Sequence, residues 1–142
     1  MTSPIRFFVP GLPAPQGSKR HVGGGRLIES SRAVKPWRTA VARTAREYID
    51  RPLEGPVEVH VEFNMPRPKA WGRKRDDPMT VRPDLDKLLR AVDDALTCVA
   101  FRDDSQVTRL IGHKRRAPHG APTGALITIY PLTSKEAPHD HL

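Results

Sequence analysis

Residues 84–99, DLDKLLRAVDDALTCV, carry the clearest helical signal in the chain. At 100° per residue their large apolar side chains fall within one arc: Leu85, Leu88, Leu89, Val92, Leu96 and Val99. Charged and polar side chains occupy the other arc. The spacing predicts an amphipathic helix over residues 85–99 that packs its apolar side on a core, with Asp84 as its N-cap.

The clearest strand is VEVHVEF, residues 57–63. Strict alternation turns its valines and Phe63 to one side and Glu58, His60 and Glu62 to the other, which predicts a half-buried strand. We interpret His60, on the polar side, as a solvent-facing strand residue rather than a ligand.

Three further strands and one further helix are expected around these two elements. IRFFV (5–9) predicts a strand, and residues 106–113 and 125–130 predict two more, joined as a hairpin by the turn residues of 118–124. A helix is expected from about residue 34 to 50, with Ser30 or Ser31 as its cap and Pro36 in its first turn.

Turn-forming residues fill the remaining segments. PQGSKRHVGGGRLIES (15–30) predicts a loop or hairpin with the glycines at its tip and RLIE (26–29) as a return strand. Residues 66–83 predict a basic surface loop, and 133–142 a frayed tail. With no internal repeat, the pattern predicts one small α+β domain over residues 1–142, with a mixed or antiparallel sheet packed against two main helices.

Length and composition set the class of protein. The 142 residues suffice for one domain with a small core, and the low apolar share of 37% suits a domain that buries surface against a partner. The single Cys98 excludes an internal disulfide; we interpret it as a small packing residue in a reducing compartment. The amino terminus does not resemble a signal peptide, and no apolar run approaches a membrane span. We expect a soluble cytoplasmic protein, in a bacterial cell or a phage-infected host.

Charge is the first indication of function. The chain holds 24 Lys and Arg against 16 Asp and Glu, a formal +8, which favours a polyanionic partner such as nucleic acid. The loop at 66–83 concentrates basic groups around Trp71, which is typical of an arm that contacts phosphates and offers an aromatic ring to a base. The candidate DNA-binding residues are Lys19, Arg20, Arg67, Lys69, Trp71, Arg73, Lys74, Arg75 and Arg82.

Aspartates gather in the second half of this basic chain. Asp84 and Asp86 open the predicted helix, and Asp103 and Asp104 follow its end. A 15-residue helix is roughly 22 Å long. A shared site therefore requires the chain to fold back after Phe101, or the next strand to return alongside the helix and bring Asp104 to its amino end. A solvated helix face followed by a turn is the plain alternative.

Clustered carboxylates repel one another unless a cation compensates them. Their hard oxygen atoms select Mg²⁺ or Mn²⁺, which activate water and stabilise charge on phosphorus. A negative pocket inside a positive surface is the outline of a nuclease.

The run RPDLDKLLRAVDDALTCVAFRDDSQV (82–107) resembles the signature of RusA-type Holliday junction resolvases. PQGSKR (15–20) and KPWR (35–38) are similar to the phage-borne branch of that family. The resemblance implies an α+β homodimer that binds four-way DNA junctions and resolves them with paired nicks, using Mg²⁺ or Mn²⁺, in DNA recombination and repair.

By motif position, the resemblance implies Asp84, Asp86 and Asp104 as metal-binding and catalytic residues. Asp94 of the D-A-L-T element and Asp103 are possible additional members. The family's catalytic lysine falls at Arg90, and the nearest lysine is Lys87. Because Arg90 shares a helix face with Asp86, we expect Arg90 to be the catalytic cation.

Two alternatives stay open: a nuclease for other branched or flapped DNA, and a DNA-binding module without catalysis. The chain lacks a P-loop, because GGGR (23–26) does not have the required spacing. Cys98 and Ser105 have no histidine partner arrangement that would make either of them a nucleophile. His139 and His141 lie in the tail and are not expected to bind metal.

Overall fold

The computed structural model describes residues 3–17 and 24–132. The expected frayed tail at 133–142, with His139 and His141, lies outside the described residues, as do Lys19 and Arg20. Within the described part of the chain, no helix is long and apolar enough to cross a membrane.

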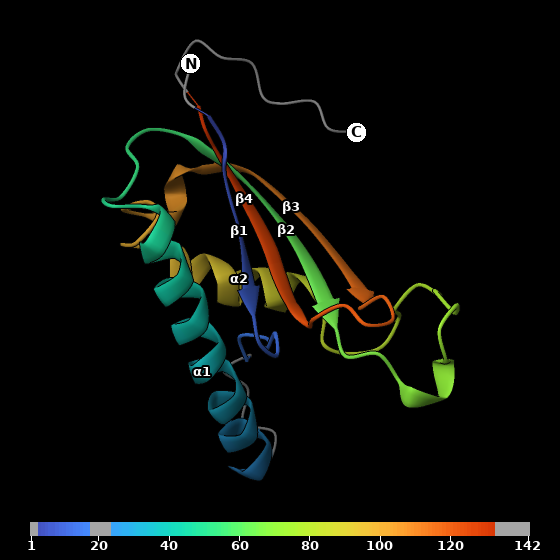
Figure 1. Ribbon diagram of the computed structural model, residues 1–142. Coiled ribbons are helices and arrows are strands. Elements are labelled where there is room, and N and C mark those ends of the chain that lie inside the picture. Colours follow the sequence, from blue (N-terminus) through green and yellow to red (C-terminus); the bar gives the residue numbers. More distant parts are fainter. Residues whose placement is uncertain (1–2, 18–23, 133–142) are drawn as a thin grey trace.

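The sheet is built around β2 (Val57–Met65), which has a hydrogen-bonded neighbour on both sides. β4 (Gly124–Pro131) pairs with it antiparallel and β3 (Val107–Arg116) pairs with it parallel. β1 (Ile5–Pro10) pairs antiparallel with β4, so the strand order is β1-β4-β2-β3 (Figure 1). This mixed sheet and two helices form a single small α+β domain, which confirms the expected fold class.

The predicted hairpin is wrong. β3 and β4 exist as expected, but β2 lies between them, and the connection that follows β3 passes the end of β2 (Figure 1). In the central position β2 has both backbone edges paired, and its apolar row lies in the middle of the core between the sheet and the helices.

Helix α1 (Gly24–Tyr48) is longer than predicted. Residues 26–29 are helical and form no return strand, and neither Ser30 nor Ser31 is a cap, because both lie inside the helix. Once the packed turns that contain Trp37 and Val41 form, each added residue gains a hydrogen bond at little further cost. Pro36 lies mid-helix on the exposed side, where water can satisfy the carbonyl that its missing N–H leaves without a partner.

Helix α2 (Leu85–Leu96) has the predicted amphipathic pattern but ends three residues earlier than expected. Leu88, Val92 and Leu96 are fully or nearly fully buried in one core with the apolar rows of the sheet and with α1. Cys98 is not a packing residue. It is exposed and has φ 71° in the turn that reverses the chain after the helix.

β2 is more buried than a half-buried strand. Glu58, on its polar side, is fully buried and its carboxylate lies 2.5 Å from Nε2 of His60. The His60 side chain is only 20% exposed and meets the Tyr130 ring edge-on at 5.0 Å. The expectation of a solvent-facing His60 is therefore wrong, because neighbouring side chains on β3 and β4 enclose the polar face of a central strand.

Gly124, at the start of β4, is the glycine that the sheet needs most. Its φ is +149°, and a Cβ there would lie 2.1 Å from the Val9 carbonyl oxygen. We expect Gly124→Ala to lower the free energy of unfolding by roughly 3 kcal/mol, because the backbone of β1 must move. Gly120→Ala is the matched control: φ is +80° there but nothing lies within 4 Å, so a loss of about 1 kcal/mol is expected. Urea unfolding measures both, and equal losses would contradict the packing argument.

Candidate active site

The amino end of α2 presents two of the expected metal ligands. Asp84 occupies the N-cap position and Asp86 lies in the first turn, and both are exposed. Asp84 makes no side-chain capping bond; its carboxylate lies 3.4 Å from Nζ of Lys87 instead. The N-cap position is confirmed, and the carboxylate is left at the surface.

Asp104 lies at the other end of α2. After the helix the chain turns through residues 97–101 and enters the short 3-10 helix η2 (Asp104–Gln106). Asp104 is close enough to Asp93 and Asp94 for their charges to interact. β3 then runs back along α2, with the Leu89 side chain packed on Gly112. The strand therefore returns alongside the helix, as one of the two expected alternatives required. Asp104, however, remains at the carboxyl end of α2 and does not reach its amino end.

The six aspartates between residues 84 and 104 therefore form two groups within one chain, one at each end of α2. Asp86 and Asp93 share a helix face but lie roughly 10 Å apart along the axis, from seven residues at about 1.5 Å each. Among residues 3–17 and 24–132, no three His, Cys, Asp or Glu side chains are arranged to hold a metal ion. The structure brings Asp104 to Asp93 and Asp94, and not to Asp84 and Asp86.

The carboxyl-end group nevertheless has the chemistry that a divalent cation selects. It offers only hard carboxylate oxygens, and Oδ1 of Asp93 is buried without a hydrogen-bond partner in the described chain. Burial, together with the charges of Asp104 and Asp94, raises the pKa of Asp93 to about 6. A cation at this position would supply the missing partner and remove the repulsion.

The two aspartates of the η2 turn differ in their environments. The Asp103 carboxylate accepts a hydrogen bond from the Ser105 N–H at 2.9 Å, which lowers its pKa. The pKa of Asp104 is raised, first by a hydrogen bond with the Asp103 side chain and then by desolvation and the charges of Asp103 and Asp94. Asp104 is thus the member of the pair whose ionised form needs an external positive charge.

The two candidate cations of α2 have different surroundings. Lys87 is engaged with Asp84. Arg90 is exposed, and no ion pair joins it to Asp86 or Asp94. The structure therefore leaves the Arg90 guanidinium exposed on the surface of α2.

The basic loop at 66–83 is folded rather than extended (Figure 1). Arg67 donates from Nε to the Gly72 carbonyl at 2.8 Å and from its terminal nitrogens to the Arg75 and Ala117 carbonyls at 2.7 and 3.4 Å. The guanidinium groups of Arg67 and Arg75 lie 5.5 and 4.7 Å from the centre of the Trp71 ring. Arg67 and Trp71 thus organise the loop, which begins with the short helix η1 (Lys69–Trp71).

The loop presents the remaining basic groups to solvent. Lys69, Arg73, Lys74 and Arg82 are exposed, and Arg75 shares its charge with Asp77 at 2.7 Å. The PQG segment, which leads toward Lys19 and Arg20, is anchored beside α2 because the Gln16 N–H donates to the Lys87 carbonyl at 3.0 Å.

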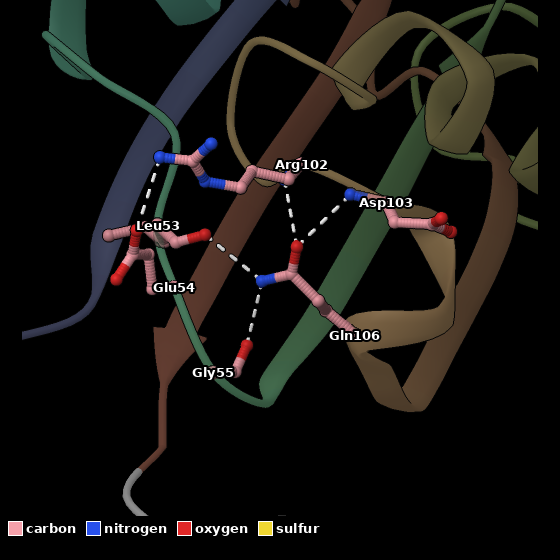
Figure 2. Close-up of polar contacts among 6 residues, drawn as sticks. All are labelled: Leu53, Glu54, Gly55, Arg102, Asp103 and Gln106. Atoms are coloured by element: carbon pink, nitrogen blue, oxygen red, sulfur yellow. Dashed lines mark hydrogen bonds and ion pairs between the residues drawn. The ribbon is translucent and has the colours of Figure 1, made fainter.

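Sequence reasoning missed three residues that build the site. Asp93 is on the polar side of the predicted helix and is not among the expected site residues, although it adjoins Asp94 in the sequence. Lys114, on β3, donates to the Val81 and Pro83 carbonyls at 2.8 and 2.7 Å and so holds the segment that enters Asp84. Gln106 ties the η2 turn to residues 53–55 (Figure 2). No local pattern reveals the last two roles, because their partners lie 31 or more residues away.

Comparison with known proteins places the chain in a family. The family described as Endodeoxyribonuclease RusA matches residues 10–130. An uncharacterized protein, YqaN of Bacillus subtilis (strain 168), is 31% identical over 120 residues, an alignment that covers 75% of this chain and 83% of the relative. The chain belongs to the RusA endodeoxyribonuclease family, as the motif at 82–107 indicated.

The raised pKa of Asp93 predicts a specific pH dependence. The folded state binds the proton more tightly than the unfolded state, so this stabilisation is complete below pH 3.8 and is lost as the pH rises through about 6. We expect Asp93→Asn to stabilise the protein by about 1–2 kcal/mol at pH 8, a value reduced for solvent screening of this partly exposed group, and to give no gain at pH 4. Thermal unfolding at both pH values measures the difference.

Two comparisons complete this experiment. Asp50→Asn removes an exposed carboxylate after α1 and should change stability equally little at both pH values. Millimolar Mg²⁺ should raise the stability of the wild type at pH 8 more than that of Asp93→Asn. An Asp93→Asn gain that is the same at pH 4 and pH 8 would show that the carboxylate repulsion is not the cause.

Proposed function

We propose that this protein is a metal-dependent endodeoxyribonuclease that resolves four-way DNA junctions by paired nicks, in DNA recombination and repair. The observation that supports it best is the carboxylate group of Asp93, Asp94 and Asp104 within a strongly basic member of the RusA family. Such a group in such a chain has the charge distribution that phosphodiester hydrolysis on DNA requires.

Mg²⁺ or Mn²⁺ is the proposed cofactor, with Asp84, Asp86 and Asp104 as its principal ligands and Asp94 and Asp103 as further candidates. When bound, the ion would lower the pKa of a water molecule and stabilise charge on the phosphate. Mg²⁺ is usually held by one or two carboxylates together with substrate phosphate oxygens. Because the structure does not bring Asp84 and Asp86 to Asp104 within one chain, we propose that substrate phosphate oxygens and a second subunit complete the site.

The protein's own residues supply the rest of the chemistry. Hydrolysis adds a water oxygen to phosphorus and breaks one phosphorus–oxygen ester bond, so negative charge develops on the phosphate oxygens and on the leaving oxygen. Arg90 stays protonated and can bind two phosphate oxygens at once. The exposed cations of the loop at 66–83, and Lys19 and Arg20, would hold the DNA backbone without reading its sequence.

A homodimer is part of the proposal. Two nicks placed symmetrically across a junction require two equivalent active sites, which a two-fold dimer provides. A dimer doubles the formal +8 of the chain, which favours junction binding with a steep salt dependence.

The carboxylates are expected to be needed for cutting and not for binding. Asp84→Asn, Asp86→Asn and Asp104→Asn keep the side-chain size but remove a charge from the metal site, so nicking should fall by about 100-fold or more. Affinity for the junction should be unchanged or higher, because a negative charge near the DNA is lost. A synthetic four-way junction incubated with and without Mg²⁺ and resolved on a denaturing gel measures the rate, and a mobility shift in EDTA measures binding.

The same gel separates the alternatives. Paired, symmetric nicks in the junction support resolution, while faster cutting of a flap or fork than of the junction would replace the substrate. Junction binding without any metal-dependent nicking would support the alternative of a DNA-binding module without catalysis. Near wild-type nicking by Asp86→Asn would exclude the assigned site.

The expected role of Arg90 is electrostatic. Arg90→Ala should lower nicking by roughly 100-fold, since one charge that stabilises the transition state is lost, while Arg90→Lys should keep much of the activity. Lys87→Ala should mainly weaken binding. Single-turnover rates with saturating protein separate these effects. An Arg90→Ala protein that nicks at the wild-type rate would show that the residue is only a surface group.

A further inference from the structure

The side-chain amide of Gln106 uses its full hydrogen-bonding capacity (Figure 2). Its Nε2 donates to the carbonyl oxygens of Leu53 at 3.0 Å and Gly55 at 2.8 Å. Its Oε1 accepts from the backbone N–H groups of Arg102 at 2.8 Å and Asp103 at 3.0 Å. All four bonds go to main-chain atoms, so Gln106 fixes the course of two chain segments.

The two segments are about 50 residues apart in sequence. One leads into β2, and the other is the turn between α2 and β3 that carries Asp103 and Asp104. Two further links reinforce the connection between the segments. The Leu53 N–H donates to the Ala100 carbonyl at 2.8 Å, and an exposed ion pair connects Arg102 with Glu54 at 3.1 Å. Gln106 is the only side chain in the described residues that bonds both segments at backbone atoms.

Within the turn, Gln106 and Asp103 cap each other. The Gln106 oxygen accepts from the Asp103 N–H, while the Asp103 carboxylate accepts from the Ser105 N–H and the Gln106 N–H donates to the Asp103 carbonyl. Asp104 is thus held from both sides along the chain, although its own side chain is exposed.

Asp104 needs such a restraint because like charges surround it. The negative charges of Asp103 and Asp94 disfavour the ionised form of Asp104. The charge of Asp104 in turn disfavours the ionised form of Asp93. An untethered surface turn would move away from α2 to relieve this repulsion. A neutral amide resists that movement without neutralising the carboxylates, whereas an arginine or lysine in its place would pair with them and compete with a metal cation.

We propose that Gln106 is the positioning residue of the carboxylate site: it holds Asp103 and Asp104 against the carboxyl end of α2 so that a divalent cation can be bound there. This inference rests on the proposed function for its substrate, but the restraint itself is a property of the free protein. Residues that orient metal ligands typically contribute 10–100-fold to metal affinity or activity.

The test compares Gln106→Met, which keeps the length and removes all four bonds, with Thr108→Val. Thr108, two residues further on, bonds only to the Val57 carbonyl at 3.4 Å and has no link to the turn. We expect Gln106→Met to raise the Mn²⁺ concentration for half-maximal binding by about 10–100-fold, measured by paramagnetic broadening of amide signals. Amide hydrogen exchange at Arg102 and Asp103 in the metal-free protein should quicken in Gln106→Met and stay normal in Thr108→Val.

Nicking of the junction provides the second readout. Gln106→Met should need more Mg²⁺ and show a lower kcat, with KM for the junction within about twofold of wild type, because DNA contacts lie elsewhere. Recovery of kcat at high Mg²⁺ is the signature of positioning. Wild-type metal binding and a wild-type Mg²⁺ requirement in Gln106→Met would overturn the proposal and leave Gln106 as scaffold.

Two further outcomes are distinguishable. If Gln106→Met does not fold, Gln106→Glu keeps the acceptor for the Arg102 and Asp103 amides and loses the donors to Leu53 and Gly55. A normal Mn²⁺ affinity in Gln106→Glu would then contradict the proposed positioning role of Gln106.

If the wild type binds Mn²⁺ at this site but nicks no branched DNA, the proposed function fails, while the hydrogen-exchange and Mn²⁺-binding measurements still decide the role of Gln106.

Discussion

The parallel pairing of β2 with β3 is the constraint on which the rest of the structure depends. Two parallel neighbours cannot be joined by a tight turn; the chain must leave one end of β2 and return to the other end before β3 begins. Here that crossover runs from residue 66 to residue 106 and contains the basic loop, α2 and the η2 turn. Every aspartate proposed for the site, and most of the cations proposed to contact DNA, therefore lie on one connection.

The crossover also separates the charges. The basic loop comes first and is stabilised internally by Arg67 and Trp71, so it can hold cations at the surface without support from the acidic residues. α2 follows, with aspartates at each end and an apolar side buried in the core. Most basic groups of the loop and the aspartates of α2 therefore occupy successive parts of the crossover, although Arg75 pairs with Asp77 and Lys87 with Asp84.

β3 restrains both ends of α2. At its far end Lys114 holds the residues that precede Asp84, and just before its start Gln106 holds the turn that precedes Asp104. Lys114 donates to the backbone carbonyl groups of Val81 and Pro83, and the Gln106 side-chain oxygen accepts from the backbone N–H groups of Arg102 and Asp103. Between these two points α2 approaches β3 closely at Gly112. The Leu89 side chain fills the space that a side chain at Gly112 would need, and this contact fixes the position of the helix on the strand.

The elements whose formation depends on nearby residues could be predicted from the sequence. The periodicity of residues 84–99 and 57–63, the cap position of Asp84 and the basic loop all depend on neighbours within a few residues. Each element predicted there is present, although α2 ends three residues early and β2 is more buried than expected. The start of α1 was missed because helix extension depends on tertiary packing of Trp37 and Val41 further along, rather than on the weak local signals near Ser30.

Only the tertiary structure decided strand order and the grouping of the aspartates. Strand spacing cannot distinguish a β3–β4 hairpin from a β2 inserted between them, because both satisfy the same alternation; burial of β2 on both edges made the choice. That choice placed Asp104 with Asp93 and Asp94 and gave Gln106 and Lys114 their distant partners. The sequence by itself determined which residues are candidates for the proposed chemistry, and long-range burial determined which of them meet.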